Sequence, residues 1–73
     1  MKIVVNGIEE TLSAPLDIAG FLQCKGLDRK GIVVELNREI VPQEDWPKRV
    51  IGENDTLEIL RFMGGGAVAW KIH

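Results

Sequence analysis

The run TLEILRF at residues 56–62 decides how this chain folds, and it leads through one methionine into three glycines. Apolar and charged residues alternate along most of the run, as they do in a β-strand, where successive side chains point to opposite faces of the sheet. With Leu57 and Ile59 directed into a core, Leu60 and Phe62 lie on the other face. We therefore expect an apolar patch at Leu60 and Phe62, next to the glycines.

The three glycines, Gly64, Gly65 and Gly66, give the chain its second distinctive feature. Without Cβ atoms the backbone is loosely held, and it is thin enough to enter a narrow slot in another protein. A flexible linker has the same composition. Seven residues, 67–73, follow the glycines. We expect one domain over residues 1–66 and a flexible C-terminal extension over residues 67–73.

Length and composition limit the classes of function. A chain of 73 residues makes one small domain, and 45% hydrophobic with 27% charged residues is typical of a globular protein. The net charge of -2 and the pI near 5.3 argue against a nucleic-acid-binding protein. The sequence has no apolar run of membrane-spanning length and no signal-peptide pattern at its start, so we expect a cytoplasmic protein.

The N-terminal half predicts a β-hairpin and then a short helix. The hairpin covers residues 3–12, with Asn6-Gly7 supplying the two positive-φ positions of a type I′ turn. Asp17 is suited to the N-cap of the helix, although Ser13 could cap an earlier start, and Gly26 is suited to its end. Because the helix is too short to be stable alone, its apolar stripe must pack on the sheet.

The C-terminal half predicts three more strands, at residues 32–36, 39–41 and 56–62. Between them Trp46 lies in a polar loop bounded by two prolines, and we interpret it as an anchor of this loop. The face bearing Leu60 and Phe62 has two alternatives to a partner contact: the Trp46 loop covers it, or the two residues are a scattered apolar pair at the surface. The element order predicts an α+β fold with a mixed four- to five-stranded sheet and one main helix on one face. The first and last strands could lie side by side and parallel.

Few residues offer chemistry of their own. Cys24 lies near the end of the predicted helix, where the helix dipole disfavours a thiolate, and His73 has no partner nearby in sequence. We interpret the remaining acidic candidates as solvated surface charges: Glu9, Glu10, Glu53 and Asp55. One cysteine cannot form an internal disulfide, and no set of ligands indicates a metal site. The sequence therefore predicts a protein that is not an enzyme by itself.

Three segments carry a family resemblance: LNREIVPQEDW at residues 36–46, GEND at 52–55 and LEILRFMGGG at 57–66. Together they resemble the ThiS-type sulfur carrier proteins of thiamin biosynthesis, part of the ThiS/MoaD family. The resemblance extends from Met1 to Gly66 without large gaps. It implies a ubiquitin-like β-grasp fold, which agrees with the element order predicted from the pattern of residues.

The resemblance also implies a function as a protein cosubstrate. An ATP-dependent, E1-like enzyme of the ThiF type would adenylate the carboxylate of Gly66, and sulfur from a donor such as a cysteine desulfurase system would convert it to a thiocarboxylate. A thiazole synthase of the ThiG type would then use this sulfur for the thiazole of thiamin. The carrier would bind no cofactor, since the partner uses the ATP. The remaining implied site residues are the approach, Gly64 and Gly65, and the partner contacts, Leu60, Phe62 and Met63.

The extension after Gly66 departs from the family pattern, because it leaves an amide where the mechanism requires a carboxylate. A protease could remove residues 67–73, the residues could be an artificial addition, or the chain could have lost the carrier function. We favour a native extension that is removed. Two alternative functions stay open: a sulfur carrier for molybdopterin, cysteine or homocysteine synthesis, and a non-catalytic β-grasp binding or conjugation module whose extension, with Trp70, is a recognition element.

Overall fold

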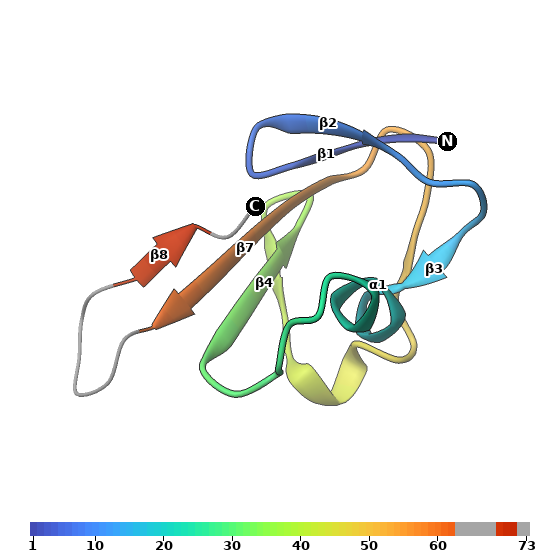
Figure 1. Ribbon diagram of the computed structural model, residues 1–73. Coiled ribbons are helices and arrows are strands. Elements are labelled where there is room, and N and C mark those ends of the chain that lie inside the picture. The colour runs from blue at the N-terminus through green and yellow to red at the C-terminus, as the bar shows by residue number, and fades with distance from the viewer. Residues whose placement is uncertain (63–68, 72–73) are drawn as a thin grey trace.

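The computed structural model describes residues 1–62 and, for the backbone, residues 69–71, and it shows one helix packed on one face of a mixed β-sheet (Figure 1). The sheet has the order β2-β1-β7-β4-β5, with β8 paired to β7, and β3 and β6 form a separate two-stranded sheet. This arrangement confirms the predicted α+β architecture. The elements in chain order are β1 (Lys2–Val5), β2 (Ile8–Thr11), β3 (Leu16–Asp17), α1 (Ile18–Cys24), β4 (Ile32–Leu36), β5 (Glu39–Val41), the 3-10 helix η1 (Gln43–Asp45), β6 (Val50–Ile51), β7 (Thr56–Phe62) and β8 (Ala69–Lys71).

The N-terminal hairpin forms as the sequence predicts. Asn6 and Gly7 both have positive φ angles, 50° and 84°, and the turn brings Val5 opposite Ile8 in the antiparallel pair β1–β2. The other edge of β1 pairs in parallel with β7, with Val5 opposite Leu57. The prediction that the hairpin's first strand lies parallel to the strand at residues 56–62 is therefore confirmed, and β7 lies between β1 and β4.

The helix begins at Ile18, capped by Asp17. The Asp17 Oδ1 atom accepts a hydrogen bond of 2.6 Å from the backbone N–H of Gly20, and Gly26, at φ 72°, follows the end of the helix. The earlier start at Ser13 is excluded, because Leu16 and Asp17 form β3 against β6. Among the described residues no helix is long and apolar enough to cross a membrane.

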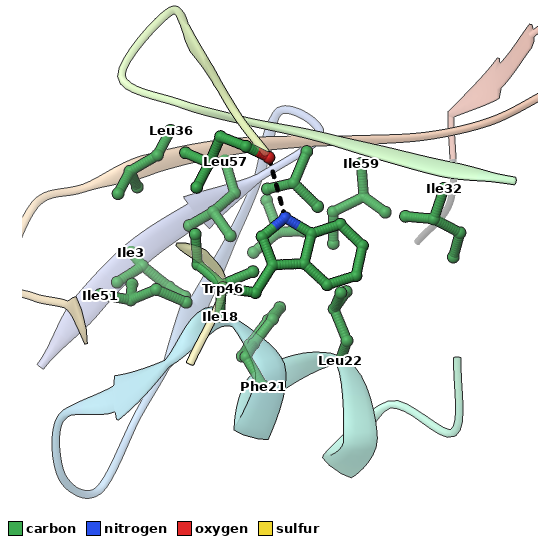
Figure 2. Packing of buried hydrophobic residues seen from close by; sticks show 13 residues of the cluster. Ile3, Ile18, Phe21, Leu22, Ile32, Leu36, Trp46, Ile51, Leu57 and Ile59 are labelled. Atoms are coloured by element: carbon green, nitrogen blue, oxygen red, sulfur yellow. Dashed lines mark hydrogen bonds between the residues drawn. The ribbon is translucent and has the colours of Figure 1, made fainter. Parts of the chain in front are cut away.

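The core lies between α1 and the sheet, and Trp46 is at its centre (Figure 2). The indole is 3% exposed, and its Nε1–H donates a hydrogen bond of 2.9 Å to the backbone carbonyl of Val41. Figure 2 shows the ring between Phe21 and Leu22 of the helix and the residues of the sheet. Trp46 is therefore the predicted anchor of its loop. Because it lies on the helix side, it does not cover the opposite face of the sheet.

A hydrogen-bonded network of turn residues fixes the start of β7. Asp55 accepts hydrogen bonds from the backbone N–H of Gly52, at 2.7 Å, and from the side-chain amide of Asn37, at 3.0 Å. The side-chain Oδ1 of Asn37 in turn accepts a hydrogen bond of 2.9 Å from the backbone N–H of Thr56. The turn between β4 and β5 and the turn before β7 thus hold each other, which sets the position at which β7 enters the sheet.

The C-terminal extension contains one described element, β8, which pairs antiparallel with β7. Its register places Trp70 opposite Arg61 and Ala69 opposite Phe62. The flexibility expected of residues 67–73 stays a prediction. Strand β8 can pair here because β7 is longer than its neighbour β1, so that the far end of β7 offers an edge to another strand.

The position of Trp46 predicts a large cost for its removal. Trp46→Ala should lower the free energy of unfolding by about 3–5 kcal/mol, because it leaves a cavity in the core. Trp46→Phe should cost about 1–3 kcal/mol, since it keeps most of the packing and loses the hydrogen bond to Val41. Chemical denaturation measures both. Ile40→Ala, at a side chain that is 66% exposed, is the control and should change stability by less than about 0.5 kcal/mol. If Trp46→Ala lowers the free energy of unfolding by less than about 1 kcal/mol, Trp46 is not the anchor of its loop.

Candidate functional site

The candidate site lies at the end of β7, where the described strand leads towards the glycines. Leu57 and Ile59 are in the core, at 0% and 1% exposure, whereas Leu60 is half-buried and Phe62 is 44% exposed on the opposite face. The predicted orientation of these four side chains is confirmed. Met63, Gly64, Gly65 and Gly66, the other predicted site residues, lie outside the described residues.

An apolar patch forms on the face of the sheet opposite the helix, and we call Val33, Leu60 and Phe62 the open-face patch. Val33 of β4 is directly opposite Leu60 of β7, and both are half-buried. In the adjacent row Glu35 is opposite Glu58. Both glutamates are half-buried, so a pair of acidic side chains borders the apolar row on this face.

Asn6 holds β7 at the point where β1 ends. Its side chain, in a residue that is only 7% exposed, accepts a hydrogen bond of 2.8 Å from the N–H of Ile59 and donates one of 3.2 Å to the carbonyl of Ile59. Its own N–H donates to the carbonyl of Leu57 at 2.9 Å. The side chain thus takes the place that the next residue of a neighbouring strand would have. Sequence reasoning assigned Asn6 to the turn alone, because an Asn-Gly pair does not reveal that the amide is buried.

On its other edge, the end of β7 is held by β4. The N–H of Phe62 donates a hydrogen bond of 2.9 Å to the carbonyl of Gly31, the residue just before β4. Gly31 has φ 72°, a left-handed conformation that glycine adopts without strain. The last described residue before the glycines is therefore hydrogen-bonded to the sheet, and the glycine segment starts from a fixed point.

The other candidate residues have structural or surface roles in the described part of the chain. Cys24 is exposed at the end of α1. Glu10 forms an ion pair with Lys25 at 2.7 Å, and Glu53 accepts a hydrogen bond of 3.0 Å from the backbone N–H of Lys2. Residues 1–62 contain no group of three or more His, Cys, Asp or Glu side chains that could hold a metal ion. His73 lies outside the described residues.

Comparisons with known proteins find a family model, a solved structure and a small protein that are similar to this chain. The model of the ThiS family matches residues 3–66. The crystal structure of the thiamine biosynthesis protein ThiS from Geobacter metallireducens is similar, with a TM-score of 0.79 and 30% identity over 90% of this chain and 100% of that chain. The sulfur carrier protein ThiS of Bacillus subtilis is 38% identical over 40 residues, covering 55% of this chain and 61% of that protein.

A longer relative matches almost the whole chain. The thiazole synthase of Paramagnetospirillum magneticum is 39% identical over 67 residues, which is 92% of this chain but 21% of that protein. The chain thus spans about a fifth of the length of this relative. The similarity concerns one segment of the synthase.

The hydrogen bonds of Asn6 can be tested by a substitution that keeps the turn. Asn6→Gly accepts the positive φ but removes both side-chain bonds to Ile59, so it should lower the free energy of unfolding by about 1–3 kcal/mol and speed amide exchange at Ile59. Asn54→Gly is the matched control, because Asn54 also has a positive φ, 67°, in an exposed turn. Equal effects of the two substitutions would contradict the role of the Asn6 side chain.

Proposed function

The chain belongs to the ThiS family, and from this we propose that it is a sulfur carrier protein for the thiazole of thiamin, with the carboxylate of Gly66 as the group that carries sulfur. The match of the family model over residues 3–66 carries the proposal. The chain acts as a cosubstrate of other enzymes. Its contribution is a docking surface and a slender arm, and its partners supply the reactive groups.

The chemistry explains why a carrier needs so little of its own. A carboxylate is a poor electrophile, and adenylation by an E1-like enzyme with ATP converts one of its oxygens into part of a good leaving group. The terminal sulfur of a persulfide, formed by a donor such as a cysteine desulfurase system, then attacks the acyl carbon. The new carbon–sulfur bond replaces the bond to AMP, and AMP leaves. Thiols then reduce the sulfur–sulfur bond of the resulting acyl disulfide and are oxidised to a disulfide, which leaves a thiocarboxylate on Gly66 that a thiazole synthase can use.

The position of the open-face patch supports a docking role next to the reactive end. Leu60 and Phe62 lie on the strand that leads to the glycines, and Phe62 is the last described residue before them. From Phe62 to Gly66 an extended backbone covers about 13–14 Å. A partner that binds the open-face patch can therefore take Gly66 into a buried site while the folded domain stays at its surface. We assign Met63 to the same contact.

The names of the relatives support the choice of partners. The relative from Paramagnetospirillum magneticum is a thiazole synthase, and the one from Bacillus subtilis is a sulfur carrier protein. We assign to this chain a thiazole synthase of the ThiG type as the acceptor of sulfur and an enzyme of the ThiF type as the activator. These relatives favour thiamin over molybdopterin, cysteine or homocysteine synthesis as the pathway served.

The extension must leave before the chemistry begins. With Ala67 attached, Gly66 is an amide and has no carboxylate to adenylate. The family match ends at Gly66, which supports cleavage after this residue. A protease that hydrolyses the bond between Gly66 and Ala67 would complete the carrier.

Mass spectrometry tests the proposal directly. A chain ending at Gly66, incubated with the ThiF-type enzyme, ATP and a sulfur source, should gain the mass of one oxygen-to-sulfur exchange. The chain with its extension should not, because it lacks the free carboxylate at Gly66. A truncated chain that binds the enzyme but never gains this mass would exclude the carrier function and favour a binding module.

Substitutions in the open-face patch should weaken binding to the activating enzyme. Phe62→Ala and Leu60→Ala should each raise its dissociation constant about fivefold or more, since a central apolar contact is worth more than about 1 kcal/mol. Calorimetry or surface plasmon resonance measures the change, with circular dichroism to confirm folding. Ile8→Ala removes an exposed apolar side chain of the hairpin, 51% exposed, and should leave binding unchanged. If Ile8→Ala weakens binding as much as Phe62→Ala, the patch is not the docking site.

A further inference from the structure

One edge of β7 has three different partners along its length. Leu57 is paired with β1, and Ile59, two residues further, is held by the side chain of Asn6. Backbone groups alternate along a strand, and the N–H of Phe62 is directed to the opposite edge, towards Gly31. The N–H and carbonyl of Arg61 therefore face the same edge as those of Leu57 and Ile59. This is the position at which neither β1 nor Asn6 provides a partner.

The chain's own extension fills this position. Strand β8 pairs with β7 over residues 60–62, and Trp70 is directly opposite Arg61. Figure 1 shows β8 beside the end of β7, beyond the hairpin of β1 and β2. Along this edge, β7 is thus hydrogen-bonded first to β1, then to the side chain of Asn6 and finally to β8.

We infer that the edge of β7 at residues 60–62 is a strand-acceptor site, for which the chain's own β8 competes with an extended segment of the activating enzyme. The inference rests on the proposed function. An open strand edge binds extended polypeptide through backbone hydrogen bonds, and the seated β8 shows that this edge accepts such a strand. The site adjoins Leu60 and Phe62 of the open-face patch, so one partner can contact both.

The pairing of β8 with β7 limits how a partner can take hold of the chain between them. Phe62 and Ala69 are opposite each other, so the six residues 63–68 between them are joined to the sheet at both ends. A partner that draws a single extended arm into a slot needs one of these ends released. Removal of the extension therefore does two things at once: it creates the carboxylate of Gly66 and it frees the edge of β7 for the partner.

The register provides a matched pair of variants in the chain with its extension. Trp70→Pro removes the N–H that faces Arg61, which blocks pairing with β7. Lys71→Pro removes an N–H that alternation directs away from β7, so pairing should survive. Both variants leave residues 1–66 unchanged. The amide of Ile59, held by Asn6, is an internal reference for all forms.

Amide hydrogen exchange measured by NMR reports the pairing. At Arg61 we expect exchange at least about tenfold faster in Trp70→Pro, and in the chain ending at Gly66, than in the unmodified chain or Lys71→Pro. Exchange at Ile59 should be the same in all four. Equal exchange at Arg61 in the four forms would show that β8 does not occupy this edge, and would overturn the inference.

Binding of the ThiF-type enzyme to the same proteins reports the competition. When only the unpaired form binds, the apparent dissociation constant is raised by the inverse of the unpaired fraction. The enzyme should therefore bind Trp70→Pro more tightly than the unmodified chain, by the same factor as the ratio of exchange rates at Arg61. Lys71→Pro should bind as the unmodified chain does.

The outcomes separate the inference from the proposed function. If the chain ending at Gly66 gains sulfur but the enzyme binds Trp70→Pro and the unmodified chain equally, the competition is wrong and the carrier function stands. If that truncated chain is neither bound nor converted, the proposed function fails and the competition fails with it. The exchange comparison at Arg61 then still decides whether the edge accepts the extension.

Discussion

The register of β7 between β1 and β4 is the constraint on which the rest of the structure depends. Five residue pairs with β4 and two with β1 fix this register, and side-chain alternation then decides which residues of β7 face the core. A shift by one residue would take Leu57 and Ile59 out of the core and turn Leu60 and Phe62 into it. Core and open-face patch are therefore two faces of one pairing. The turn network at Asp55 and the amide of Asn6 both act on this strand.

Much of this fold could be predicted from the sequence, because its signals are local. The positive-φ pair Asn6-Gly7, the cap at Asp17 and the alternation along residues 56–62 each act within a few residues. The two-residue strands β3 and β6 could not be predicted, since such short segments have no periodicity. The burial of the Asn6 amide and the pairing of β8 also escaped, because both depend on where β1 stops beside β7. The docking role of Leu60 and Phe62 remains a prediction.

The proposed division of labour between a carrier and its partner enzymes suits a chain of 73 residues. A domain of this size has little interior beyond its core, and here Trp46 and the helix occupy it. What the surface offers is an apolar patch, a pair of opposed glutamates and a strand end held by a hydrogen bond to Gly31. In the proposed function these features position a terminal carboxylate for chemistry that other proteins perform. We infer that the extension, through β8, connects the maturation of that carboxylate with access to β7.

The transfer of sulfur from Gly66 into product is the most direct test of the proposed carrier function. The chain ending at Gly66 can be loaded with isotopically heavy sulfur as the thiocarboxylate and then given to a thiazole synthase with its remaining substrates. We expect the heavy sulfur in the thiazole, and carrier with its carboxylate restored. An unlabelled thiazole, with the thiocarboxylate still on the carrier, would contradict the function.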